Sequence, residues 1–226
     1  MLWSRATVRT GTAGDALFLE RRNSVTTIAV SQASARRSLR RELWARRAAQ
    51  PRAARRAASR LVCAHLARAP WFRPGLAIAL YLSRGSEVDT ASLLALARRR
   101  GCRVYLPRIT DYVAHRMLMV RDGGGGRTLN RYRIAEPRGA ATLPAQALAL
   151  VLMPLVGFDG KGNRLGNGAG YYDRFVSPRL ARYGHPLLIG IAFECQRLDA
   201  LPSAAHDVPL DGVITERGLQ YFLRRS

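Results

Sequence analysis

The chain has 226 residues, 48% of them hydrophobic, which is enough to bury the core of one large domain or two small ones. It contains no run of about eighteen apolar residues, so the sequence predicts no membrane-spanning helix. The cysteines Cys63, Cys102 and Cys195 are far apart and form no CxxC pair, which argues against a zinc site or a disulfide framework. Free thiols are typical of a reducing cytoplasm, and we expect a cytoplasmic protein.

The net charge of +22 is large and unevenly distributed. The first 70 residues carry 15 arginines against 3 acidic residues, a net charge of +12 (15 − 3), and Lys161 is the one lysine of the chain. Such a charge favours either a nucleic-acid-binding surface or sites for polyanionic small molecules. Because no zinc-finger, RNA-recognition or homeodomain pattern is present, we favour the small molecules, together with a compositional preference for arginine.

Residues 1–30 show no sustained helical or strand period. We predict a disordered N-terminal extension here and a single domain over residues 31–226. The arginine-rich, acid-poor composition is also typical of a transit peptide, but no clear amphipathic helix accompanies it. We therefore expect that removal of residues 1–30 spares the activity.

From Ser34 onward, apolar residues recur at three and four positions, which predicts a helix that Pro51 interrupts. A second helix should run to about Ala69, with Leu61, Val62 and Leu66 facing inward. Pro107 should end the strand that we predict at 104–106. The remaining pattern predicts a strand at 76–82, a helix at 90–100, strands at 104–106 and 117–120, a glycine turn at 122–126, mostly loop over 127–146, a strand at 148–152, a helix at 172–183, and strands at 187–193 and 212–215.

Strands and helices alternate through residues 75–195. This order predicts an α/β fold of three layers, with a mostly parallel sheet covered by helices on both faces.

The segment 153–173, MPLVGFDGKGNRLGNGAGYYD, is rich in glycine. An apolar run at 147–156 leads into it, and six glycines follow within fourteen residues. Closely spaced glycines let the backbone approach a ligand, and successive N–H groups in such a loop can bind phosphate. The segment is not a P-loop, because Gly160–Lys161 is followed by Gly162, and its spacing does not match the dinucleotide fingerprint. The spacing alone predicts a phosphate loop of unspecified type; the alternative is a long flexible hairpin.

Two flanking residues add chemistry to this loop. Arg164 can form two parallel hydrogen bonds with a phosphate. Asp173 stands near the first turn of the predicted helix, where a carboxylate either binds Mg²⁺ or stabilises the helix N-terminus. Residue type alone leaves both alternatives open.

NRLGNGAGYYDRF (163–175) closely resembles the signature of the 5-formyltetrahydrofolate cyclo-ligase family, also called 5,10-methenyltetrahydrofolate synthetases. Six further segments resemble the family and follow in its order, over about residues 34–216. They are ARRSLRREL (35–43), ALYLSRGSEVDT (79–90), LPRI (106–109), HRMLMV (115–120), MPLVGFD (153–159) and HDVPLDGVIT (206–215).

The resemblance implies a Rossmann-like fold and an ATP- and Mg²⁺-dependent conversion of 5-formyltetrahydrofolate to 5,10-methenyltetrahydrofolate, with release of ADP and phosphate. It implies a cytoplasmic enzyme, which we expect to be a monomer with no specific nucleic-acid partner. The alternative class is a basic nucleic-acid-binding protein on the same scaffold, which the charge of residues 1–70 motivates.

The resemblance also assigns site residues by position. Arg164 would be catalytic, and Asp173 and Asp207 would bind Mg²⁺. Glu87 would accept hydrogen bonds from the pterin. The ATP site would comprise Arg36, Arg37, Ser38, Leu39, Arg40, Arg164, Leu165, Gly166, Asn167, Gly168, Ala169, Gly170, Tyr171 and Tyr172. The folate site would comprise Leu82, Glu87, Asn167, Gly168, Ala169, Gly170 and Tyr171.

Several of these residues also have structural interpretations. Arg36 and Arg40 share one helical face at i, i+4 spacing, which is also typical of a solvated basic face. Glu87 also reads as an exposed loop acid, and Asp207 as a turn residue before Pro209. We expect Trp44 and Tyr81 in the core, with stacking on a ligand as the alternative, and we interpret His65, His115, His185 and His206 as structural or surface residues.

Overall fold

The computed structural model describes residues 32–123, 125–177, 186–204 and 207–223. The chain divides into two compact units, residues 1–39 and 40–226, and a helical segment covers residues 32–49. The predicted extension over residues 1–30 lies outside the described residues. Within the described part, no helix is both long and apolar enough to cross a membrane.

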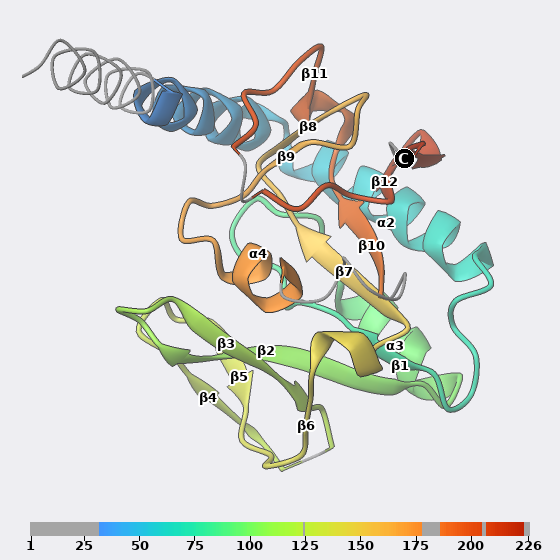
Figure 1. Cartoon of the computed structure of the whole chain (residues 1–226). Coiled ribbons are helices and arrows are strands. Elements are labelled where there is room, and N and C mark those ends of the chain that lie inside the picture. The colour runs from blue at the N-terminus through green and yellow to red at the C-terminus, as the bar shows by residue number, and fades with distance from the viewer. Residues whose placement is uncertain (1–31, 124, 178–185, 205–206, 224–226) are drawn as a thin grey trace, which may run out of the picture. The chain divides into compact units, whose positions relative to one another are not determined.

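An eight-stranded sheet forms the centre of the larger unit, in the order β13-β12-β10-β7-β1-β2-β3-β6 (Figure 1). The five strands β12, β10, β7, β1 and β2 run parallel, while β13, β3 and β6 pair antiparallel at the two edges. The strands are β1 (Ala77–Ala79), β2 (Arg103–Asp111), β3 (Arg116–Arg121), β6 (Thr142–Leu143), β7 (Leu150–Pro154), β10 (Leu187–Ile191), β12 (Gly212–Thr215) and β13 (Gly218–Tyr221).

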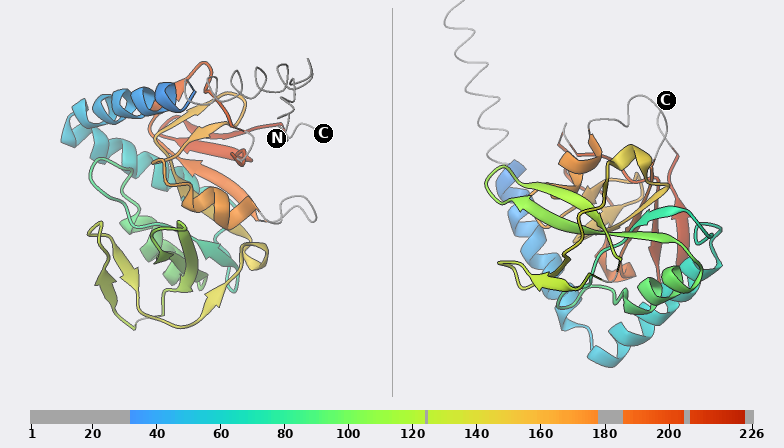
Figure 2. Two further views of the ribbon diagram at one scale, coloured as in Figure 1. Left: turned by 60° about the vertical axis from the view of Figure 1, so that its left-hand side comes forward. Right: turned by 90° about the horizontal axis from the view of Figure 1, so that it is seen from below.

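Helices cover both faces of this sheet, and the alternation of side chains along each strand explains why (Figure 2). Leu150 and Leu152 of β7 pack with helices α2 (Arg52–Arg68) and α3 (Ala91–Arg99) on one face. Val151 and Met153 pack on the other face with α4 (Tyr171–Val176). The predicted three-layer α/β fold with a mostly parallel sheet is therefore confirmed.

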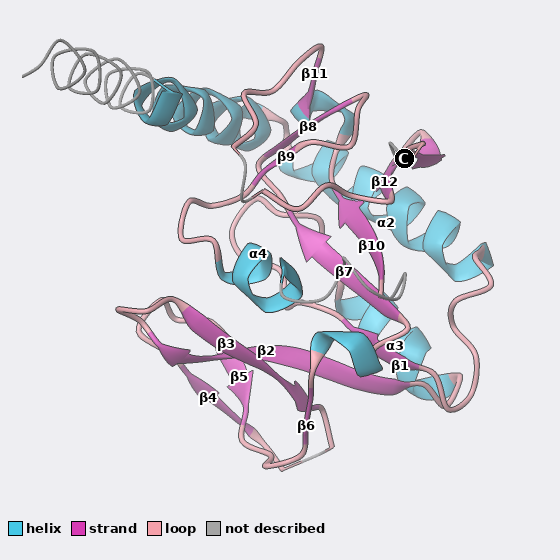
Figure 3. Cartoon of the chain, in the orientation of Figure 1, coloured by secondary structure: helices cyan, strands magenta, loops and turns pink. Residues whose placement is uncertain are grey.

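Smaller elements lie outside the central sheet (Figure 3). Among the described residues, they comprise a three-stranded sheet in the order β11-β8-β9, a two-stranded hairpin and two short 3-10 helices. They are β4 (Arg127–Leu129), β5 (Ala135–Pro137), β8 (Gly157–Asp159), β9 (Arg164–Leu165), β11 (Arg197–Leu198), η1 (Ala145–Ala147) and η3 (Glu194–Gln196).

Three expectations about the elements are wrong. The strand predicted at 104–106 does not end at Pro107. Its pairing with β1 ends at Tyr105, so from there on β2 is paired with β3 alone, and a strand that is paired on one side can contain proline. Leu61 is 51% exposed, because the buried positions of α2 are Ser59, Val62 and Leu66, at three- and four-residue spacing. The predicted loop over 127–146 contains β4, β5, β6 and η1.

Several arginines donate to backbone carbonyl groups where segments end. Arg100 Nη1 donates to Ala67 O at 2.8 Å, and Arg103 Nε donates to Gly75 O at 2.9 Å. These bonds satisfy carbonyl groups at the end of α2 and in the turn before β1. Some of the arginines thus act as hydrogen-bond donors to backbone carbonyl groups.

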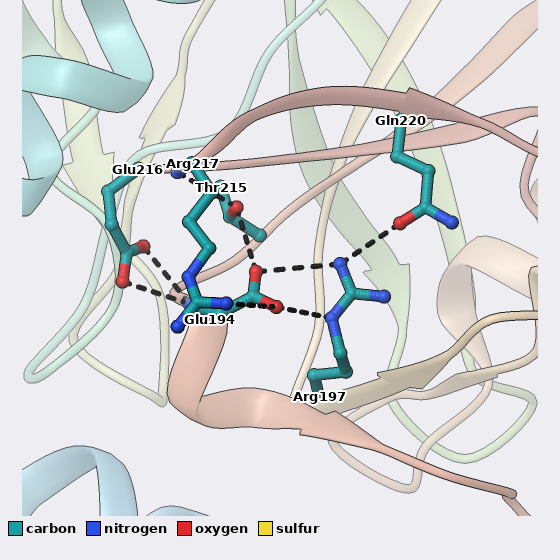
Figure 4. Close-up of polar contacts among 6 residues, drawn as sticks. All are labelled: Glu194, Arg197, Thr215, Glu216, Arg217 and Gln220. Carbon is teal, nitrogen blue, oxygen red and sulfur yellow. Dashed lines mark hydrogen bonds and ion pairs between the residues drawn. The ribbon is translucent and has the colours of Figure 1, made fainter.

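A polar cluster joins the carboxyl ends of β10 and β12 (Figure 4). The Glu194 carboxylate accepts hydrogen bonds from Arg197 Nε and, at 3.0 Å, from Thr215 Oγ1. Arg197 Nη2 also donates to Gln220 Oε1 at 3.0 Å. Burial alone would raise the pKa of Glu194, but the hydrogen bonds from Arg197 and Thr215 outweigh it and lower this pKa below its ordinary value of 4.5.

We expect Glu194→Gln to lower the free energy of unfolding at pH 7 by about 1 kcal/mol, because hydrogen bonds to the charged carboxylate are lost. A carboxyl group with a lowered folded-state pKa stabilises the protein above its unfolded-state pKa, and this contribution is lost as the pH falls through the folded-state pKa. Urea unfolding from pH 7 down to about pH 3 should therefore show the difference from wild type shrinking with acidity. The surface variant Glu42→Gln is the control, and a difference that grew with acidity would contradict this account.

Candidate active site

The candidate active site is a cavity of about 570 Å³ at the carboxyl ends of β1 and β7. Tyr81 and Leu82 follow β1, Pro154 ends β7, and all three line the cavity. The strand order reverses between these two strands, because β2 lies on one side of β1 while β7, β10 and β12 lie on the other. Open α/β sheets bind ligands at such a switch point.

The glycine loop forms a wall of this cavity between β9 and α4. Gly168 has φ +107° and Gly170 has φ +69°, values that favour glycine. Ala169 lies between them without a positive φ, so the alanine fits the loop. Arg40 Nε donates to Gly166 O at 2.8 Å, which joins the helical segment to the loop.

Arg164 is buried at the base of the loop and connects three segments. Its guanidinium donates to the Val208 carbonyl and, through Nη2, to Asp173 Oδ1 at 2.5 Å. Burial lowers the pKa of Arg164, while the negative charges of Asp173 and Asp207 act in the opposite direction. The side chain lines the cavity, so a positive charge is held at one fixed place in the wall.

Asp173 lies in the first turn of α4 and lines the cavity. Its Oδ1 accepts hydrogen bonds from Arg164 and, at 3.2 Å, from the Val208 N–H. Asp173 therefore has a structural role as the ion-pair partner of Arg164. Among the described residues, no group of three or more His, Cys, Asp and Glu side chains is placed to hold a metal ion. Mg²⁺ often binds proteins through one or two carboxylates and completes its shell with water and substrate phosphates. Asp173 and Asp207 both act on the charge of Arg164, and a magnesium site at these two carboxylates stays a prediction.

Leu82 and Glu87 line the same cavity from the loop that follows β1. Glu87 Oε2 accepts the Arg84 backbone N–H at 2.9 Å. Burial raises the pKa of Glu87, while the Arg84 N–H, the charge of Arg47 and the Asn167 side chain oppose this rise. Because Asn167 belongs to the glycine loop, Glu87 connects the two predicted binding regions.

Tyr172 lies beside Glu87, and its hydroxyl is buried without a hydrogen-bond partner among the described residues. Burial raises the pKa of Tyr172, and the nearby charge of Glu87 raises it further. A neutral phenol that lines a cavity can donate a hydrogen bond to a bound ligand.

The structure brings most of the predicted site residues together. Glu87, Leu82, Arg164, Asp173 and the glycine-loop residues 166–167 and 169–172 line one cavity. Leu165 is buried beside Arg164 in β9, and Asp207 is near enough to influence the charge of Arg164. The residues Arg36, Arg37, Ser38 and Leu39 belong to the other compact unit, so their role stays a prediction.

Sequence reasoning missed two groups of cavity residues. The first is the buried Arg47; Trp44, expected in the core with stacking on a ligand as the alternative, is 39% exposed and lines the same cavity. The second group comes from β5 and the turn before it, a segment predicted as loop. Its members are Asn130, Tyr132, Ile134, Ala135 and Glu136. Glu136 is 7% exposed, and its Oε1 accepts from Asn130 Nδ2 at 2.7 Å and from the Ile109 N–H at 2.9 Å, which holds this wall against β2.

Two of the four histidines interpreted as structural or surface residues lie among the described residues, and that interpretation stays a prediction. His65 Nε2 lies 3.3 Å from Glu216 O, and the His115 ring packs edge-on against Tyr171 with centroids 5.5 Å apart. His185 and His206 lie outside the described residues.

Comparisons with known proteins identify the family of the chain. The family model described as 5-formyltetrahydrofolate cyclo-ligase matches residues 32–216. A protein of that name from Escherichia coli (strain K12) is 36% identical over 141 residues, which is 61% of this chain and 76% of the relative. Its counterpart from Mus musculus is 29% identical over 199 residues, covering 83% of this chain and 97% of the relative.

The fold also matches a solved structure. The NMR structure of Aquifex aeolicus 5,10-methenyltetrahydrofolate synthetase superposes with a TM-score of 0.72 at 27% identity, covering 84% of this chain and 95% of that chain. The family match thus covers the glycine loop, all the residues that line the cavity, and every strand of the central sheet except β13. The chain belongs to the 5-formyltetrahydrofolate cyclo-ligase family of enzymes.

Proposed function

We propose that this chain converts 5-formyltetrahydrofolate to 5,10-methenyltetrahydrofolate and uses ATP as co-substrate, with release of ADP and phosphate. The observation that supports this most is the single cavity shared by Glu87 and Leu82 on one wall and by Arg164 and the glycine loop on another. A reaction between a folate and a nucleotide needs both to lie in one place.

In the proposed reaction, the formyl oxygen attacks the γ-phosphorus of ATP, a new O–P bond forms, and the bond to ADP breaks. N10 of the folate then attacks the activated formyl carbon and loses its proton, and the C–O bond breaks to release phosphate. The substrate supplies both nucleophiles, so the protein has to orient the reactants and stabilise charge during phosphoryl transfer.

The residues of the cavity suit this task. The backbone N–H groups around Gly168 and Gly170 would bind phosphate oxygens. Arg164 would stabilise the negative charge that develops on the transferred group. Glu87, as a carboxylate, would accept hydrogen bonds from the amino and ring N–H groups of the pterin.

Asp173 and Asp207 would hold Mg²⁺ together with the ATP phosphates. The ion would neutralise phosphate charge and orient the nucleotide. Since Asp173 is already bonded to Arg164, it would bind the ion through an oxygen that this ion pair leaves accessible.

The test is the absorbance of the methenyl product when the purified chain is mixed with 5-formyltetrahydrofolate and Mg-ATP. We expect product to form, ADP to appear in equal amount, and both to cease when the metal is chelated with EDTA. Well-folded protein that yields no product would contradict the proposal. The nucleic-acid alternative would require binding that persists above physiological salt, because purely electrostatic binding falls steeply with salt.

A further inference from the structure

Arg47 is a buried arginine that lies beside the cavity and belongs to none of the sequence motifs. Its side chain is 7% exposed and lines the cavity. It lies four residues after Leu43, on the same face of the helical segment, and Leu43 is 1% exposed. A β-carbon added at Gly157 would lie 2.6 Å from Leu43 Cδ1, so this face packs closely against the start of β8. The packing fixes where the guanidinium lies.

The hydrogen bonds of Arg47 go to neutral groups. Its Nε donates to Ser86 Oγ at 3.0 Å, and its Nη1 donates to Leu155 O at 3.4 Å. Gln196 Nε2 donates to the same Leu155 carbonyl at 2.8 Å, so this acceptor is itself held in place. These bonds orient the guanidinium without neutralising its charge.

The charge of Arg47 therefore acts on the neighbouring carboxylate. Burial lowers the pKa of Arg47, and among the charges that oppose this, Glu87 has the largest effect. Glu87 is one residue after Ser86, the hydroxyl that Arg47 holds. The groups that face Glu87 are Arg47 from the helical segment, Arg84 from its own loop, Asn167 from the glycine loop, and the phenols of Tyr81 and Tyr172.

We propose that Arg47 is a positioning residue that keeps Glu87 ionised and oriented, and so sets the lower pH limit of folate binding. This inference rests on the proposed function, because it takes Glu87 as the carboxylate that binds the pterin. Arg47 itself need not touch the folate: it holds the Ser86–Glu87 turn through a hydrogen bond and favours the charged form of Glu87 through its own charge.

The sign of the effect follows from the charge. A nearby cation lowers the pKa of a carboxyl group, so removal of the Arg47 charge raises the pKa of Glu87. The ionised, hydrogen-bond-accepting form of Glu87 then predominates only at higher pH. Folate affinity should consequently fall at a higher pH than in the wild type.

The experiment measures the Kd of 5-formyltetrahydrofolate without ATP, from pH 5 to pH 9. Arg47→Gln removes the charge but keeps hydrogen-bond donors, and Arg47→Lys keeps the charge. Arg46→Gln is the matched control: it removes one arginine from the same helical segment, where Arg46 is exposed and pairs with Glu42. Arg47→Met fills the same buried space if Arg47→Gln does not fold.

For Arg47→Gln we expect the acidic limb of binding to move upward by about one pH unit, and Kd near the limb to rise about ten-fold. The limb should stay in place for Arg47→Lys and Arg46→Gln. An unmoved limb in Arg47→Gln, or an equal loss of affinity at every pH in both Arg47 variants, would overturn the inference. A wild-type chain that binds the folate but forms no product would contradict the proposed reaction alone. The pH titration of folate binding would then still test the role of Arg47. A wild-type chain that does not bind the folate would overturn both the proposed reaction and the role of Arg47.

Discussion

Replacement of Arg164 with alanine should reduce kcat/KM for ATP by about 10²–10³-fold, the usual effect of removing one group that stabilises transition-state charge. The same change should lower the free energy of unfolding by about 3 kcal/mol, because it leaves the Asp173 carboxylate and the Val208 carbonyl without their buried partner. The measurements are steady-state kinetics with varied ATP and urea unfolding of the same preparations. The buried contacts of Arg164 are the reason why we expect lower stability in addition to slower use of ATP.

Arg164→Lys separates the two effects. It keeps a positive charge but replaces the planar fork that reaches Asp173 and Val208 at once. We expect it to recover part of the stability and little of the ATP kinetics. Arg217→Ala is the control, since the Arg217 side chain is 78% exposed and should change stability by less than about 0.5 kcal/mol. Unchanged ATP kinetics in Arg164→Ala would show that the phosphate site lies elsewhere.

Gly168→Ala should weaken the use of ATP while leaving the sheet intact. Gly168 has φ +107°, and a side chain in this region introduces backbone strain of about 1–3 kcal/mol. A β-carbon there would also lie 3.5 Å from Arg40 Cζ, next to the bond from Arg40 to Gly166. If the loop relieves the strain by moving, its N–H groups no longer point at one phosphate position, and we expect KM for ATP to rise by about ten-fold or more.

The control for this variant is Gly160→Ala. An added β-carbon at Gly160 meets nothing within 4 Å, and the position has no positive φ, so the same substitution carries no strain there. Both variants should unfold cooperatively: Gly160→Ala at a temperature close to wild type, and Gly168→Ala below it by the several degrees that about 1–3 kcal/mol of strain implies. A Gly168→Ala enzyme with wild-type KM for ATP would mean that the loop shape does not determine nucleotide binding.

The parts of the fold that could be predicted from sequence are those in which one physical signal dominates. The parallel strands β7, β10 and β12 are short apolar runs, because a strand covered by helices on both faces buries all its side chains. Gly168 and Gly170 were identifiable because a backbone with positive φ favours glycine. These signals are local, and they position the sheet and the loop.

The rest depends on contacts between distant segments. The wall around Glu136 comes from β5 and the turn before it. β5 and its partner strand β4 have three residues each, which is too short for a pattern of alternating apolar residues to be recognised. Glu136 is held in place by the hydrogen bond that it accepts from the Ile109 N–H, 27 residues away in the sequence. Arg47 belongs to a segment dense in arginine, and sequence alone does not distinguish it from the exposed Arg46 beside it. Packing of Leu43 against Gly157 makes that distinction.

The bonds from arginine to backbone carbonyls bear on how the positive charge of this protein should be understood. A guanidinium has five donors in a planar fork, so Arg164 reaches a carbonyl and a carboxylate together, and Arg197 reaches a carboxylate and an amide. An ammonium group has neither the reach nor the planar geometry for such paired contacts. A hypothetical chain with every arginine changed to lysine would keep the net charge of +22 but lose many of the ties between its segments. The net charge of the chain and the hydrogen bonds by which its arginines connect separate segments are therefore two distinct consequences of this composition.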